Sequence, residues 1–141
     1  MNFAPYQWAL CFYLDFFIKS VFMSFLGLLI TLNGAPVFDF VVAAFFLSLF
    51  HLLCLFLGWL SVYLLEQVGS QLTGRPRFVV TLGFANLFFV VSLAAIGGWG
   101  EAPADAFSEF SGHLVVASIL AITNFIPVTI AAACGRILSR S

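Results

Sequence analysis

Four long apolar stretches constrain this chain more than any other feature of its sequence. They cover residues 8–32, 37–65, 78–99 and 113–138. A transmembrane helix needs about 20 consecutive, mostly apolar residues, and each stretch reaches that length. The sequence therefore predicts an all-α, polytopic integral membrane protein. Its single domain, residues 1–141, is expected to be a bundle of four transmembrane helices.

The charge content excludes the main alternative classes of protein. Only 8% of the 141 residues are charged, whereas about a quarter of the residues of a soluble domain are. Intrinsic disorder requires the opposite composition, with few apolar residues and many charges. Lys and Arg together number 5, too few for a nucleic-acid-binding surface. We therefore expect the lipid bilayer, and not nucleic acid, to be a partner of this chain.

The sequence contains no motif of a metal, nucleotide or cofactor site. Cys11, Cys54 and Cys134 lie in apolar stretches without a CxxC spacing, which is typical of packing residues. A membrane haem needs two histidines at one depth, but His113 lies at the end of its stretch and His51 near the middle of another. No HExxH, P-loop, GxGxxG or GxSxG sequence occurs. We expect no metal, no cofactor and no catalytic residue.

The arginines predict the orientation, because short cytoplasmic loops carry an excess of Lys and Arg. Arg75 and Arg77 lie between the second and third stretches, and Arg136 and Arg140 lie at the C-terminal end. The first and third connections contain no Lys or Arg. We therefore expect both termini and the second connection to be cytoplasmic, in a bacterial inner membrane.

Two prolines mark the last part of the chain. Pro103 is suited to begin a short helix within the third connection, with Phe107 and Phe110 on one face. We expect this helix to lie in the membrane interface, and the alternative is a lid or a partner-docking element. Pro127 lies inside the fourth stretch, where we expect it to kink the helix.

Each stretch has small or weakly polar residues at helical spacing on one face. In a bilayer, such faces let helices approach closely, whereas the burial of Leu or Phe provides no driving force. In chain order, the expected packing faces are Ser20, Ser24, Gly27 and Thr31; Ala44, Ser48, His51 and Gly58; Gly83, Asn86, Ala94 and Gly97; and His113, Ala117, Ala121, Asn124, Ala131 and Gly135. Most of the 19 phenylalanines, Phe45 and Phe56 among them, are expected to face lipid or a partner protein.

Ionisable residues within the apolar stretches are functional candidates, because a charge inside a membrane is costly. Asp15 and Lys19 are spaced i, i+4 and can pair, and His51 lies near mid-depth. With Asn86 and Asn124 they form the candidate intramembrane polar site. One hypothesis is a proton or ion relay that uses the titration of histidine near neutral pH. The sequence favours the other, in which the charges compensate each other and His51 is a packing residue, because the trio has no diagnostic spacing.

The near absence of extramembrane mass leaves helix faces and short connections as the working surfaces of the chain. The first hypothesis is therefore a non-catalytic subunit, regulator or immunity-type partner of a larger membrane complex. The alternative is a homo-oligomeric small channel or transporter that uses polar residues inside the bundle. A membrane enzyme comes third, since the sequence offers no convincing nucleophile–base pair.

Overall fold

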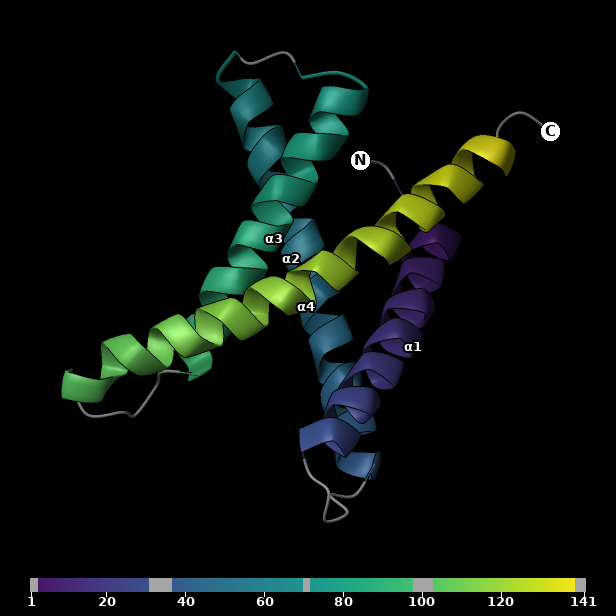
Figure 1. Ribbon diagram of the computed structural model, residues 1–141. Coiled ribbons are helices and arrows are strands. Elements are labelled where there is room, and N and C mark those ends of the chain that lie inside the picture. Colours follow the sequence, from purple (N-terminus) through teal and green to yellow (C-terminus); the bar gives the residue numbers. More distant parts are fainter. Residues whose placement is uncertain (1–2, 31–36, 70–71, 98–102, 139–141) are drawn as a thin grey trace. The chain divides into compact units, whose positions relative to one another are not determined.

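The computed structural model describes residues 3–30, 37–69, 72–97 and 103–138, which form four helices and no strand (Figure 1). The helices are α1 (Pro5–Ile30), α2 (Val37–Gln67), α3 (Arg75–Gly97) and α4 (Pro103–Leu138). Each contains a segment long and apolar enough to cross a membrane: Pro5–Phe25, Asp39–Gln67, Arg75–Ile96 and Ser111–Leu138. The predicted all-α fold with four membrane-spanning helices is confirmed, and a lipid bilayer is the environment that these helices require.

Proline lies in the first turn of three helices. Pro5 begins α1, Pro103 begins α4, and Pro76 is the second residue of α3. The first turn suits proline because its backbone N–H groups have no partner within the helix. Between α2 and α3, Gly69 and Gly74 have φ angles of 113° and 66°, which side chains disfavour, so glycine allows the chain to turn there.

The prediction of a separate short helix after Pro103 is wrong. α4 runs without a break from Pro103 to Leu138. No proline interrupts residues 104–126, and adding a turn to an existing helix is easier than nucleating a second one. The side chains of Phe107 and Phe110 lie outside the described residues. α4 also continues through Pro127, so this proline does not end the helix.

The chain divides into two compact units. Unit 1 contains Leu53–Ile122, and unit 2 contains Asn2–Leu52 together with Thr123–Ser141. Part of α2 and part of α4 therefore belong to each unit. The expectation of one membrane domain over residues 1–141 stays a prediction.

In unit 1, α2 approaches the backbone of α3 closely at Gly58. An ideal Cβ at this glycine would lie 2.6 Å from the Thr81 carbonyl oxygen and 2.9 Å from the Ala85 nitrogen. Glu66 near the end of α2 and Arg77 at the start of α3 form an ion pair of 3.1 Å. The two helices are therefore antiparallel neighbours, and only a residue without a Cβ fits at position 58.

Position 83 on α3 differs from the expected packing face. Gly83 is exposed, and a Cβ added there would meet no described atom within 4 Å. Asn86 is half-buried, whereas Ala94 is buried. α3 instead buries Thr81, Ala85 and Phe89, because Gly58 of α2 packs against this side of the helix.

In unit 2, α1 has a polar inner face and an apolar outer face. Gln7, Cys11, Asp15 and Lys19 are buried at successive four-residue intervals. The opposite face exposes Tyr13, Phe17, Val21 and Phe25. The expected packing residues Ser20 and Ser24 are only half-buried. α1 therefore buries these four residues more fully than Ser20 and Ser24, because the helix turns its charged residues inward, away from lipid.

Burial of the other expected packing residues varies along the chain. On α2 and α4 the buried ones are Ala44, Ser48, His51, Gly58, Ala117, Ala121, Asn124 and Ala131, while His113 and Gly135 are half-buried. Thr31 and the packing of Gly27 and Gly97 lie outside the described residues.

Aromatic rings connect α1 and α2 within unit 2. Phe45 of α2 meets Phe12 and Phe16 of α1 edge to face, at centroid distances of 5.7 and 5.9 Å. Phe45 is also 41% exposed, so only part of it faces outward as expected. Phe89 in unit 1 is fully buried and is another exception among the phenylalanines.

Candidate functional site

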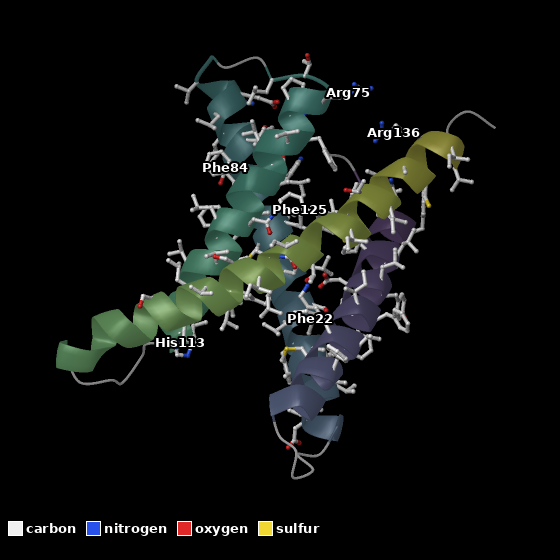
Figure 2. The ribbon with its side chains drawn as sticks, viewed as in Figure 1. Phe22, Arg75, Phe84, His113, Phe125 and Arg136 are labelled. Atoms are coloured by element: carbon white, nitrogen blue, oxygen red, sulfur yellow. The ribbon has the colours of Figure 1, made fainter. Side chains whose placement is uncertain are left out.

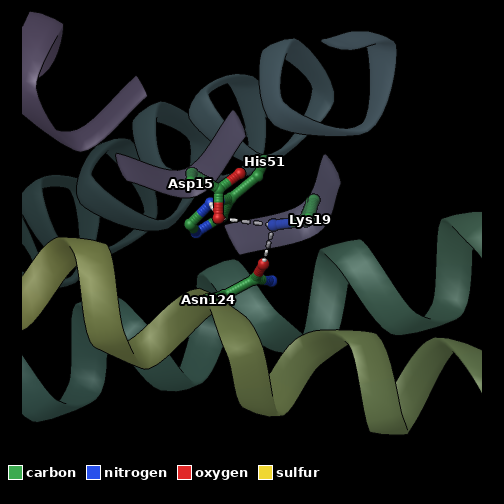
Figure 3. Close-up of polar contacts among 4 residues, drawn as sticks. All are labelled: Asp15, Lys19, His51 and Asn124. Atoms are coloured by element: carbon green, nitrogen blue, oxygen red, sulfur yellow. Dashed lines mark hydrogen bonds and ion pairs between the residues drawn. The ribbon is translucent and has the colours of Figure 1, made fainter. Parts of the chain in front are cut away.

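The site is a cluster of four polar side chains inside unit 2: Asp15 and Lys19 of α1, His51 of α2 and Asn124 of α4 (Figure 3). Lys19 is at its centre. Its Nζ donates to Asp15 Oδ1 at 2.5 Å and to Asn124 Oδ1 at 2.7 Å. One ammonium group therefore links two helices by charge-assisted hydrogen bonds.

His51 joins the cluster from α2, so that three helices contribute to it. Its Nδ1 lies 3.2 Å from Asp15 Oδ1, the same oxygen that accepts from Lys19. One carboxylate oxygen thus faces two nitrogens that can both carry positive charge. The i, i+4 spacing places Asp15 and Lys19 on one side of α1, so that both can be reached from α2 and α4.

The cluster is shielded from the surroundings. Asp15, Lys19 and Asn124 are 0% exposed, and His51 is 1% exposed. Removing one ion from water costs several kcal/mol, so an ionised side chain without a neighbouring counter-ion would be strongly unfavourable at this place. Asp15 and Lys19 cancel each other's charge, and Asn124 provides a further dipole for the ammonium. The pair is therefore tolerated in the interior because it is compensated and hydrogen-bonded.

The cluster lies near the middle of the helical segments that are long and apolar enough to cross a membrane. Asp15 is the central residue of the Pro5–Phe25 segment, and Asn124 and His51 lie close to the centres of theirs. This is the depth at which an ionisable residue is most costly. The polar contacts of this cluster connect α1, α2 and α4. Its ionisable side chains can also donate and accept protons.

Some buried oxygens in unit 2 have no hydrogen-bond partner among the described residues. They are Asp15 Oδ2, Ser48 Oγ and Ser20 Oγ. Ser48 is fully buried and lies one turn before His51 on the same face of α2. Buried oxygens of this kind are rare in folded proteins and are often associated with a strained or functional site.

Gln7 is a further polar contact of the same face, and the sequence analysis missed it. Its side chain donates through Nε2 to the Ala131 carbonyl of α4 at 2.9 Å and accepts from Ala4 N at 2.9 Å. Gly135 leaves space for this amide, since a Cβ there would overlap the Gln7 side chain. The four-residue spacing of Gln7, Cys11 and Asp15 is the sequence signal that could have identified this residue.

The structure brings together four of the five expected polar residues. Asn86 belongs to unit 1, where its Nδ2 donates to the Leu82 carbonyl of the same helix at 3.0 Å. Among the described residues, no three His, Cys, Asp or Glu side chains are grouped so that they can hold a metal ion.

Comparison of this chain with protein-family models, with curated proteins and with solved structures gives no match.

Proposed function

We propose that this chain is a non-catalytic subunit or regulator of a larger membrane complex, of which an immunity-type partner of a membrane target is one form. The observation that supports this proposal is the distribution of side chains. The charged residues of α1 contact other residues of unit 2, whereas large apolar side chains are exposed along every helix.

These exposed side chains provide an extensive surface for protein contacts. Figure 2 shows side chains around each helix, and those of Phe17, Phe46 and Phe125 are 66%, 63% and 45% exposed. Rings on the outer surface of a membrane protein contact either lipid or the helix of a partner. When such a ring contacts a partner helix, it gives up equivalent dispersion contacts with lipid. Whether the ring binds the partner or the lipid therefore depends on shape complementarity and on small residues that allow close packing.

Photo-crosslinking from two phenylalanine positions tests the proposal. A photoreactive phenylalanine analogue at Phe17 should yield adducts with another protein in native membranes. The same analogue at Phe89, which is fully buried, is the matched control and should not. Lipid adducts alone at Phe17, with only the bare chain recovered in mild detergent, would exclude the proposal.

The second candidate function is a homo-oligomeric small channel or transporter. The observation that favours it is the mid-membrane position of the Asp15–Lys19–His51–Asn124 cluster, since intramembrane charges commonly mark ion pathways. Native mass spectrometry should then give one oligomer size, and liposomes that contain the chain should conduct ions. A monomer without flux would exclude this candidate.

For the orientation, we propose that both termini and the connection after α2 are cytoplasmic in a bacterial inner membrane. The contacts of Gln7 with Ala131 and of Lys19 with Asn124 make α1 and α4 antiparallel. The start of α1 and the end of α4 therefore lie at one end of unit 2. Arg136 at that end of α4 is consistent with the cytoplasmic side.

A further inference from the structure

The charge balance of the buried cluster has one unusual feature. Asp15 carries one negative charge, and its Oδ1 faces the nitrogens of two cation-forming residues, Lys19 and His51. Lys19 alone neutralises the carboxylate. A second positive charge on His51 would lie beside the same carboxylate, which would attract it. Each of the two cations would be attracted by this carboxylate oxygen, while they would repel each other.

We propose that the cluster is a site for one exchangeable proton, held by His51 against Asp15. In the unloaded state His51 is neutral, with the proton on Nδ1 directed at Asp15 Oδ1. In the loaded state the Nε2 lone pair has accepted a proton, and Nδ1–H still faces the carboxylate. The Nε2–H bond forms as an O–H bond of a hydronium ion breaks, which leaves water, and release is the reverse of uptake.

Lys19 and Asn124 keep this site selective for a proton. The Lys19 ammonium permanently occupies one side of Asp15 Oδ1, and its bond to Asn124 Oδ1 holds it in place. A metal cation at the carboxylate would lie beside this ammonium with few oxygen ligands. A proton on the His51 imidazole places its charge beside Asp15 Oδ1 and needs no shell of oxygen ligands.

Other groups around His51 support exchange. On its own helix, Ser48 is buried one turn away, and its Oγ has no hydrogen-bond partner among the described residues. On α1, Asp15 Oδ2 also has no hydrogen-bond partner among the described residues, and Cys11 is buried one turn before Asp15. On α4, Asn124 is the facing polar group and does not titrate. Hydroxyl and carboxylate oxygens of this kind can hydrogen-bond the water that delivers the proton.

This site goes beyond the proposed subunit role, because proton binding in unit 2 requires no partner protein. Its test therefore uses the purified full-length chain in lipid nanodiscs. The sequence contains only 2 histidines, so ¹⁵N-histidine NMR separates His51 from His113 with single variants. In His113→Gln, the remaining His51 signal should convert reversibly from the neutral to the imidazolium form on acidification, below the pH of about 6.5 at which a free imidazole titrates.

Two further variants make the test specific. With Asp15→Asn and Lys19→Gln combined, the counter-charge is lost, and the folded chain should keep His51 neutral at the pH at which the His51 signal of His113→Gln converts. Wild type should take up about one proton per chain more than His51→Gln on acidification, while His113→Gln keeps this uptake. A His51 signal that stays neutral in folded His113→Gln overturns the proposal. Failure to detect a partner or ion flux would contradict only the functions proposed above.

Discussion

At the residue scale, Lys19 connects two helices of unit 2 through one buried ammonium group. Its ammonium binds an acceptor on its own helix and one on α4, and all three groups are fully buried. A lysine in this position is stable only while Asp15 keeps its charge. The removal of one partner leaves a buried charge without compensation, which is far more costly than the removal of both.

Asp15→Asn should therefore destabilise the folded chain by about 3 kcal/mol, because it leaves the Lys19 ammonium without its counter-ion. Adding Lys19→Gln should restore much of this loss, since neither remaining side chain is charged. Unfolding in mixed detergent micelles measures both effects. Asp39→Asn, at an exposed carboxylate, is the control and should change little. Equal losses in the single and double variants would contradict compensation.

Asn124→Ala should lower stability by roughly 1–2 kcal/mol, since Lys19 loses an acceptor that joins α1 to α4. Asn86→Ala provides a matched comparison, because Asn86 is half-buried and donates to a carbonyl of its own helix. Thermal unfolding in detergent, followed by circular dichroism, should give a lower Tm for Asn124→Ala than for Asn86→Ala. The reverse order would mean that the Lys19–Asn124 bond contributes little.

At the scale of the helices, close backbone approach and exposure distinguish residues of the same type. Gly58 and Gly83 both lie in apolar helices, and the sequence placed both on packing faces. In the folded chain, only Gly58 contacts the backbone of another helix. The difference arises because each helix buries one face, and residue 83 lies on the exposed side of α3.

Gly58→Ala should destabilise the chain by about 1–3 kcal/mol, because its Cβ would force the α3 backbone away at Thr81 and Ala85. Gly83→Ala should be neutral or stabilising by up to about 1 kcal/mol, since alanine favours a helix over glycine. Detergent unfolding of the two variants, purified side by side, provides the comparison. A larger loss for Gly83→Ala would show that its face packs against a neighbour.

At the scale of the whole molecule, the number of spans decides which connections share a side of the membrane. Val68 follows α2 and Ser111 lies in α4, so α3 crosses the bilayer between them. Cysteines introduced by Val68→Cys and Ser111→Cys should label from opposite sides, with position 68 reached from the cytoplasm. The background is Cys134→Ser, which leaves only the buried Cys11 and Cys54. Labelling of both positions from one side would exclude the four-span arrangement.

The number and type of the helices could be predicted from the sequence because lipid imposes a local requirement. Backbone polar groups cannot remain unpaired in hydrocarbon, so each apolar stretch of sufficient length must form a helix. The pairing of Asp15 with Lys19 was also predictable, since their i, i+4 spacing acts within one helix. Burial of the α2 and α4 faces follows a similar local signal in small residues.

Contacts between helices were decided only by the tertiary structure. Nothing in the spacing of Asn86 and Asn124 indicates that Lys19 binds the second, or that His51 shares the Asp15 oxygen. The face of α1 that is buried most fully was likewise not the one expected from its small residues, because Gln7, Cys11, Asp15 and Lys19 take the inner positions. In a bilayer, hydrophobicity drives a helix into the membrane but does not choose its neighbour. That choice depends on close packing and on charges that require a partner, and both are properties of the folded chain.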